Sequence, residues 1–320
     1  MGSHVAKPKK PSRTYGSNES KEHVDAEVEI VETKPLPSAW VVAFRKRMTE
    51  GINCCPSVLG GQFTVRQGIN LHKFCILPTY IAILAAYNPA GWYKFEDTYG
   101  AAAAVLLVCH TVYGLFWIYK DIHFPDKNWQ AKASLFGIIQ LVIQLGVIYC
   151  LPMWCLVTKK CYCGTFGDGS EIWLVAIALL CFLTGCLTMF LSDIQKFVQL
   201  KYNKGQLVDT AMFAYSRNPN YFGEALLYLG FGILSCHWIC IIAITAFQVL
   251  IFVPNILAKD ASLSRYERFE EWKSRTGLFF PNVYGLFRDF FKQGFNRTPS
   301  LPWDESKAII DSDYRPLGKK

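Results

Sequence analysis

The segment Ile172–Leu191 reads IWLVAIALLCFLTGCLTMFL, an apolar run without a charged residue. A helix needs about 20 such residues to cross the hydrocarbon core of a bilayer, because it rises about 1.5 Å per residue and the core is about 30 Å thick. The segment therefore predicts a membrane-spanning helix. The number of similar segments on either side of it then indicates the fold.

Five further segments have a similar composition. Tyr99–Tyr119 and Ser134–Val157 are long and apolar, and Trp238–Ala258 contains only three polar or kinking residues. Phe74–Tyr87 and Tyr221–Ser235 are shorter. Only helices and closed barrels satisfy their backbone polar groups inside a bilayer, and long apolar runs favour helices. The sequence thus predicts an all-α fold, a polytopic membrane bundle of about six transmembrane helices.

The distribution of basic residues predicts the side of the membrane on which each loop lies. With six helices, 30 of the 33 lysines and arginines fall on the side that carries both termini. The other three are Lys94, Lys159 and Lys160. Because short cytoplasmic loops are rich in Lys and Arg, both termini are expected to be cytoplasmic. The net charge of +8 then reflects topology and attraction to anionic lipids, and nucleic acid is not an expected partner.

The chain divides into five parts. Residues 1–38 mix Lys, Glu, Ser and Pro without apolar periodicity, which is typical of a disordered tail, here a cytoplasmic one. Residues 39–68 join an apolar run to a basic cluster and predict a cytoplasmic or interfacial segment. Residues 69–169 hold the N-terminal transmembrane helices and residues 170–285 the C-terminal ones. Residues 286–320 are expected to form a second cytoplasmic tail.

The chain contains 12 cysteines, and most of them lie in the apolar segments, where they are expected to pack as small apolar side chains. The stretch Cys236–Cys240 reads CHWIC and offers metal ligands in a predicted hairpin turn. Structural metal sites usually draw on a second ligand pair, and the sequence shows none at a suitable spacing. The sequence therefore predicts no bound metal.

The motif RNPNYFGE, Arg217–Glu224, contains the start signals of a helix. Asn218 is a favoured N-cap residue, and Pro219 suits the first helical position. The positive end of the helix dipole and the free amide groups of the first turn would then face the cytoplasmic boundary, where an anion is stabilised. Arg217 adds a positive charge there.

A polar stripe follows on the same helix. Asn220, Glu224 and Tyr228 are spaced four residues apart, so they lie on one face of an otherwise apolar helix. An ionisable group inside a membrane costs about 2 kcal/mol or more, which makes Glu224 a candidate for a functional site. A structural ion pair with a loop Lys or Arg is the alternative for Glu224. Further polar residues are expected in the same cytoplasmic layer: Asp193, Lys196, Lys259, Arg265, Tyr266 and Arg275.

Residues 170–285 resemble the steroid 5-alpha-reductase C-terminal superfamily, in particular its broad, uncharacterised multi-pass membrane branch. The matching motifs are DIQK at Asp193–Lys196, GQLVDT at Gly205–Thr210 and SRNPNYFGE at Ser216–Glu224, followed by a segment that ends in Phe280-Pro281. Related proteins include sterol and polyprenol reductases that use NADPH, and isoprenylcysteine carboxyl methyltransferases that use S-adenosylmethionine. The chain lacks the histidine cluster that steroid reductases carry before the tyrosine matched by Tyr266.

The resemblance implies a membrane oxidoreductase that reduces a carbon-carbon double bond of a lipid-soluble, steroid- or isoprenoid-like substrate with NADPH. The alternative is an S-adenosylmethionine-dependent methyltransferase acting on a lipid or prenylated substrate. Residues 69–169 would then face the substrate and residues 170–285 the cofactor, in a multi-pass protein of the endoplasmic reticulum. The expected cofactor-binding residues are Asp193, Lys196, Arg217, Asn218, Asn220, Tyr221, Glu224, Tyr228, Lys259, Arg265, Tyr266 and Arg275.

A reductase of this kind also needs a proton donor near the double bond. His110 and Tyr113 in the second predicted helix are the candidates, and Glu224 completes the expected catalytic set. Gln140 and Gln144 lie four residues apart on the third predicted helix and are expected to bind a substrate carbonyl, with interhelical hydrogen bonding as the alternative.

Overall fold

The computed structural model describes six stretches of the chain, residues 37–52, 62–87, 98–158, 171–203, 205–235 and 237–294. Most of the two predicted tails, residues 1–38 and 286–320, lies outside the described residues. The described part is built from helices, with one two-stranded ribbon.

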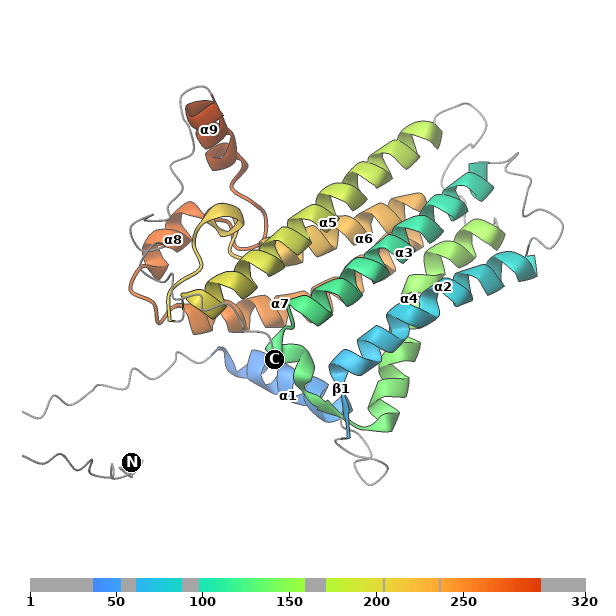
Figure 1. Cartoon of the computed structure of the whole chain (residues 1–320), viewed down its shortest axis with the longest axis horizontal. Coiled ribbons are helices and arrows are strands. Elements are labelled where there is room, and N and C mark those ends of the chain that lie inside the picture. The colour runs from blue at the N-terminus through green and yellow to red at the C-terminus, as the bar shows by residue number, and fades with distance from the viewer. Residues whose placement is uncertain are drawn as a thin grey trace, which may run out of the picture. The chain divides into compact units, whose positions relative to one another are not determined.

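The helices are shown in Figure 1: α1 (Ala39–Ile52), α2 (Val65–Tyr87), α3 (Thr98–His123), α4 (Leu135–Thr158), α5 (Glu171–Tyr202), α6 (Pro219–Leu234), α7 (Trp238–Leu263), α8 (Phe269–Arg275) and α9 (Val283–Gly294). Two short 3₁₀ helices are η1 (Lys127–Gln130) and η2 (Ala211–Ala214). Strand β1 (Phe63–Thr64) pairs antiparallel with β2 (Lys132–Ala133), and this pairing ties the start of α2 to the start of α4.

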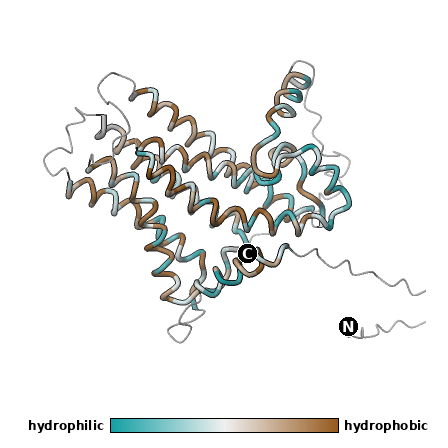
Figure 2. The backbone as a smooth tube through the Cα atoms, turned by 180° about the vertical axis from the view of Figure 1, so that it is seen from behind, coloured by the Kyte–Doolittle hydropathy of each residue, from teal (hydrophilic) through white to brown (hydrophobic). Residues whose placement is uncertain are grey.

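Five of the described helices, α2, α3, α4, α5 and α7, are long and apolar enough to cross a membrane. The predicted all-α membrane bundle is thereby confirmed. The sixth predicted span is also helical, but α6 has 16 residues, fewer than the roughly 20 that span a bilayer. In Figure 2 the hydrophobic residues run along the bundle helices, and hydrophilic residues gather in the segments around α8.

Two predicted helices are longer than their apolar segments. Helix α2 begins at Val65, nine residues before the predicted Phe74, and α5 continues to Tyr202, beyond the predicted Leu191. The extensions carry charged side chains, and three of them form ion pairs: Arg66 with Asp121, Asp193 with Lys120 and Lys196 with Asp126. These pairs help the helices to continue past the point where the apolar run stops.

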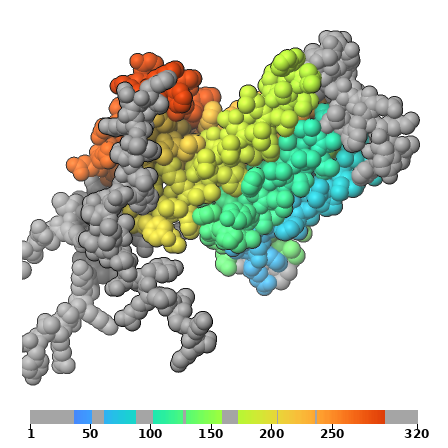
Figure 3. Space-filling model, turned by 45° about the horizontal axis from the view of Figure 1, so that its top comes forward, coloured from blue at the N-terminus to red at the C-terminus, as the bar shows by residue number. Residues whose placement is uncertain are grey.

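The bundle is arranged around the contact between α5 and α6. Helix α2 packs against α3 and α4, α3 packs against α5, and α7 packs against α6. Figure 3 shows α5 lying beside α3, with α2 on the far side of α3. Large apolar side chains point outward from these helices, such as Leu115, Val147 and Leu180, each more than half exposed. Such an outer surface suits contact with lipid tails.

Glycines allow the backbones of α5 and α6 to approach closely. A Cβ added at Gly223 would lie 2.5 Å from the Met189 nitrogen and 2.7 Å from the Gly185 oxygen. A Cβ at Gly230 would lie 2.7 Å from the Ala178 oxygen. Because hydrophobic burial does not drive helix association inside a membrane, close packing of small residues does much of that work. The α5–α6 contact therefore has no room for even one methyl group at these positions.

We expect Gly223→Ala to destabilise the folded protein by about 1–3 kcal/mol, the usual cost of overpacking a close contact. Gly146→Ala in α4 is the matched control, because no atom lies within 4 Å of a Cβ added there. The apparent melting temperature in detergent should fall for the first variant and stay level or rise for the second. Equal melting temperatures for the two variants would contradict the close α5–α6 contact.

Helix α9 was not expected from the sequence, which predicted a tail from residue 286. Its side chains Val283, Leu286, Phe287 and Phe290 recur at the spacing of one helical face, and all four are exposed. Only 12 residues long, the helix lacks the length of a span. The helix is therefore amphipathic. Its apolar side chains do not form the long continuous run from which a membrane span is predicted.

Candidate active site

Polar side chains from four helices meet in the interior of the bundle. Two of them are the Tyr113 hydroxyl of α3 and the Tyr228 hydroxyl of α6, which lie 3.1 Å apart. Both tyrosines are buried, at 1% and 7% exposure. We call the whole group the inner cluster, and its members are Lys73, His110, Tyr113, Tyr149, Glu224 and Tyr228.

The predicted polar stripe of α6 faces this cluster. The carboxylate of Glu224 has the Tyr113 hydroxyl as a hydrogen-bond neighbour, and its charged neighbours include Lys73 and Lys120. Tyr228 stands one turn further along the same face and contacts Tyr113. Glu224 and Tyr228 are therefore brought together with Tyr113.

Lys73 and Tyr149 are the members of the cluster that the sequence analysis missed, and Lys73 is the charged one. Its side chain is buried at 6% exposure, and its ammonium lies 4.1 Å from the ring centre of Tyr113 and 4.4 Å from that of Tyr149. The ring of Trp117 is also within cation–π range, at 5.6 Å. Lys73 points into the bundle. The presence of a lysine inside a spanning segment was the sequence signal that could have identified it as a candidate site residue.

The hydrogen bonds of His110 indicate which ring nitrogen carries its proton. The Tyr80 hydroxyl donates to the carbonyl oxygen of Tyr149, so its own oxygen can accept from His110 Nδ1, 2.9 Å away. The backbone of Leu106 also hydrogen-bonds the ring. Nδ1 is thus the protonated nitrogen, and Nε2 is a buried acceptor without a hydrogen-bond partner among the described residues.

A small cavity lies beside His110, with room for about one water molecule. Tyr149 and Tyr228 contribute polar groups to its wall, and the rest is apolar: Ile148, Pro152, Phe231 and Ile244. The ring of His110 stacks on Phe231, with the ring centres 3.8 Å apart. The cavity therefore lies between the inner cluster and apolar side chains of α4, α6 and α7.

Ion pairs form a second polar layer toward the end of the bundle where α3, α5 and α7 finish and α4 and α6 begin, which we call the polar end. Lys120 of α3 binds Asp193 of α5, and both side chains are largely buried. Lys196 binds Asp126 at 3.2 Å. The predicted residues Asp193 and Lys196 are thus present in this layer, but their partners Lys120 and Asp126 were not identified from the sequence.

The first turn of α6 carries two predicted residues between these layers. Asn220 has a buried side-chain oxygen that finds no donor among the described residues. Tyr221 packs its ring against Phe252 at 4.8 Å, and its charged neighbours are Glu224, Asp126, Asp193 and Arg45. An amide or hydroxyl donor from a ligand would satisfy the Asn220 oxygen, whose lack of a partner otherwise costs free energy.

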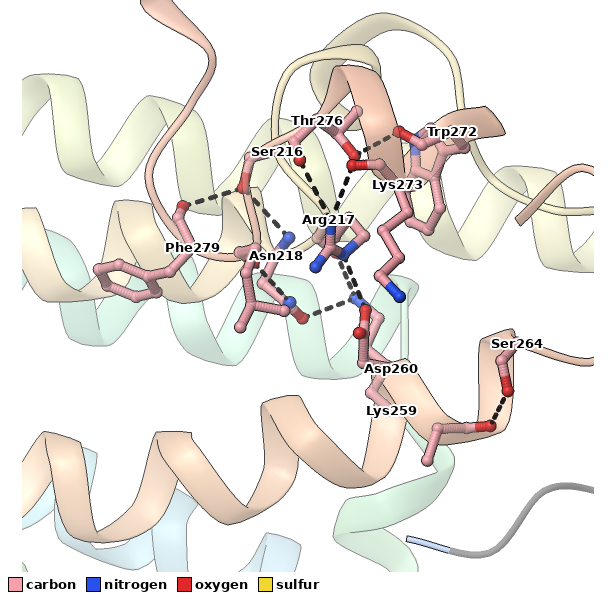
Figure 4. A network of polar contacts seen from close by, with 12 residues as sticks. Ser216, Arg217, Asn218, Lys259, Asp260, Ser264, Trp272, Lys273, Thr276 and Phe279 are labelled. Atoms are coloured by element: carbon pink, nitrogen blue, oxygen red, sulfur yellow. Dashed lines mark hydrogen bonds and ion pairs between the residues drawn. The ribbon is translucent and has the colours of Figure 1, made fainter. Parts of the chain in front are cut away.

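Arg217 is held in a network at the polar end (Figure 4). Its guanidinium binds Asp260 at 2.7 Å and donates to the carbonyl oxygens of Lys273 and Thr276 at 3.3 and 3.1 Å. The Lys259 ammonium donates to the Arg217 carbonyl oxygen at 3.0 Å. Arg217 and Lys259 thus bind protein groups that join the start of α6 to the segment after α7.

Asn218 is the N-cap of α6, and Pro219 occupies its first turn, as the motif predicted. The Asn218 side chain, however, does not cap the helix. Its Nδ2 donates to the Leu278 carbonyl oxygen at 2.9 Å, and its Oδ1 accepts from Lys259 at 3.1 Å. The side chain is drawn to these partners because the chain after α8 returns beside the start of α6.

The other predicted basic residues lie around α8. Arg275 pairs with Asp209 at 3.4 Å, and Arg265 donates to the Tyr266 hydroxyl at 3.1 Å. The aromatic rings of Phe269 and Trp272 are buried against Phe213 of η2. Arg265, Tyr266 and Arg275 therefore contact the Phe213 region and not the inner cluster.

The two predicted substrate-binding glutamines are not in the inner cluster. Gln140 and Gln144 both lie exposed on α4, whereas Tyr149 of the same helix is buried in the cluster. The spacing of four residues places the glutamines on one face, as expected, but that face is directed outward.

Residues 118–276 match the family described as Protein of unknown function (DUF1295). This family is associated with steroid 5-alpha-reductase-like membrane proteins. The match covers about half of the chain, from the end of α3 to the end of α8, and includes the whole motif Arg217–Glu224. A search of curated proteins found no match. Lys73, His110 and Tyr113 precede the matched residues.

Proposed function

We propose that the protein is a membrane oxidoreductase that uses NADPH to reduce a carbon-carbon double bond of a lipid-soluble, steroid- or isoprenoid-like substrate. The observation that carries this proposal is the buried pair of hydroxyls of Tyr113 and Tyr228 beside Glu224 and Lys73. Such a group can hold and deliver a proton inside an apolar bundle. We propose the endoplasmic reticulum as its membrane, an expectation that rests on the resemblance alone.

The residues present fit a dinucleotide held between the polar end and the inner cluster. The buried, unsatisfied oxygen of Asn220 suits a donor such as a carboxamide or a ribose hydroxyl. Lys196 and Lys259 lie near one another at the polar end and supply positive charge for phosphates. When bound, NADPH would supply the hydride, and the protein would supply binding, orientation and the proton.

Tyr113 is the best-placed proton donor. Its hydroxyl contacts both Tyr228 and Glu224, and the Lys73 ammonium lies over its ring, where it stabilises negative charge left on the oxygen. Glu224 in turn lies near Lys120 and Asp193, so it connects Tyr113 to the polar layer from which a proton can be replaced. His110 Nε2 is a buried acceptor beside a cavity with room for about one water, which suits accepting a hydrogen bond from that water better than donating a proton.

The charges around Glu224 favour NADPH over S-adenosylmethionine. Lys73 and Lys120 are already neighbours of this carboxylate. Asp193, the partner of Lys120, balances the second lysine, so a sulfonium cofactor would add a positive charge that no carboxylate of this group offsets, and such a charge is costly where solvent does not screen it. The phosphates of NADPH, by contrast, complement the lysines at the polar end.

We expect NADPH to raise the apparent melting temperature of the purified protein, and S-adenosylmethionine to leave it nearly unchanged. A ligand present at 100 times its Kd stabilises the state that binds it by about 2.7 kcal/mol. The measurement is a thermal melt in detergent with each cofactor at several concentrations. Stabilisation by S-adenosylmethionine alone would reverse the proposal.

Glu224→Gln should remove the stabilisation by NADPH, because Glu224 is one of the residues expected to hold the cofactor, while Lys120 keeps its partner Asp193. Glu50→Gln is the control, since the Glu50 side chain is exposed on α1 and contacts only Lys46 at 3.8 Å. Membrane insertion should be the same for both variants. If Glu224→Gln keeps the full shift, Glu224 serves structure and not cofactor binding.

A further inference from the structure

A cluster of soft ligands lies at the end of the bundle opposite the polar end. It consists of Cys155 in the last turn of α4, His237 at the N-cap of α7 and Cys240 in the first turn of α7. The ligand atoms of these three residues lie within 4.8 Å of one another. None of the three takes part in the proposed reduction.

We propose that Cys155, His237 and Cys240 form a metal site that binds Zn²⁺. The two sulfur atoms are 3.5 Å apart. Zn–S bonds of about 2.3 Å place two sulfurs of a tetrahedral site roughly 3.8 Å apart, so one ion fits between them with a small adjustment. Three protein ligands leave the fourth tetrahedral position for a water molecule, as in catalytic zinc sites.

The burial of the thiols favours a divalent ion. Cys155 is 2% exposed and Cys240 is fully buried. Two thiolates and one neutral imidazole balance the charge of Zn²⁺, whereas a monovalent ion such as Cu⁺ would leave a net negative charge in an apolar setting. Uncompensated buried charge is costly, and the neutral complex is therefore preferred.

His237 has a different role without the ion. Its Nδ1 accepts a hydrogen bond from the Ile239 amide at 2.9 Å and so caps α7. A metal on Nδ1 displaces that amide, and a metal on Nε2 requires a proton on Nδ1. Metal binding at either nitrogen therefore replaces the cap hydrogen bond. His237 is half-buried, so it can make this exchange without opening the bundle.

The sequence predicted no metal because the CHWIC stretch has no second ligand pair nearby. The missing ligand comes from α4, which packs against α7. Cys236 is outside the described residues, and the site does not depend on it.

The test is a titration of the purified, reduced protein with Cd²⁺, a probe whose binding to thiolates gives an ultraviolet charge-transfer band. We expect one equivalent to bind tightly and Zn²⁺ to displace it. Cys155→Ser and Cys240→Ser should each lose that equivalent, while Cys109→Ser, a buried cysteine of α3 outside the cluster, should keep it.

His237→Asn separates metal binding from folding, because Asn is a good N-cap but a poor zinc ligand. The affinity for Cd²⁺ should fall at least tenfold, because the loss of even a residue that only hydrogen-bonds a metal ligand lowers metal affinity by about 10–100-fold. The melting temperature of the metal-free protein should stay level. Unchanged Cd²⁺ binding in Cys155→Ser would overturn the site. So would an intact mass that shows Cys155 and Cys240 joined as a disulfide in protein purified without reductant.

Discussion

Tyr113→Phe is expected to lower the rate of NADPH oxidation by roughly 10²–10⁴-fold, the usual contribution of a positioned general acid. The variant removes only the hydroxyl that contacts Tyr228 and Glu224, and it keeps the ring on which Lys73 packs. The rate is measured from the loss of NADPH absorbance with steroid or isoprenoid substrates that contain a polarised double bond.

Tyr87→Phe is the matched control, because Tyr87 lies on the same bundle but is 47% exposed and packs against Trp154. Its rate should equal that of the original protein. Thermal stabilisation by NADPH should persist in Tyr113→Phe, since this residue is assigned to proton delivery and not to cofactor binding. A rate for Tyr113→Phe within a few-fold of the original would mean that the proton comes from elsewhere.

Arg217→Gln is expected to destabilise the protein by about 3–5 kcal/mol, the cost of leaving one partner of a buried ion pair alone. Asp260 loses its guanidinium, and the carbonyl oxygens of Lys273 and Thr276 each lose a donor. Hydrogen exchange should accelerate first in residues 272–282, because Arg217 is one of the side chains that fasten this segment to the start of α6.

Arg265→Gln provides the comparison for this variant. Among the described residues, Arg265 bonds to Ser262 and Tyr266 on its own stretch of chain, so its loss should change stability by well under 1 kcal/mol. If the two variants have the same melting temperature and the same exchange pattern, the Arg217 network does not hold the segment.

The order and type of the membrane helices were predictable because each rests on a long apolar run, a signal that depends only on local composition. The stripe of Asn220, Glu224 and Tyr228 was predictable for a similar reason, since helical spacing alone puts the three on one face. The start of α6 at Pro219 followed from the preferences of cap residues. These features need no knowledge of neighbouring helices.

The features that sequence analysis missed depend on contacts between distant segments. Lys73 points inward because three aromatic rings from α3 and α4 surround it. From sequence alone, a lysine beside an apolar segment is instead expected to extend toward the membrane surface. The Asn218 side chain leaves its cap position because Lys259 and Leu278, far along the chain, offer it partners. For Gln140 and Gln144, the spacing correctly predicted that both lie on one face of the helix. It could not predict that this face is directed outward.

The length of α6 sets where the two reactants of the proposed reaction can meet. At about 1.5 Å per residue, its 16 residues extend roughly 24 Å, about 6 Å less than the hydrocarbon core. A bilayer whose far boundary meets the turn between α6 and α7 would place the Asn220 end below the level of the lipid headgroups on the other side. A water-soluble dinucleotide would therefore descend into the membrane to react, and a lipid substrate would never have to leave it.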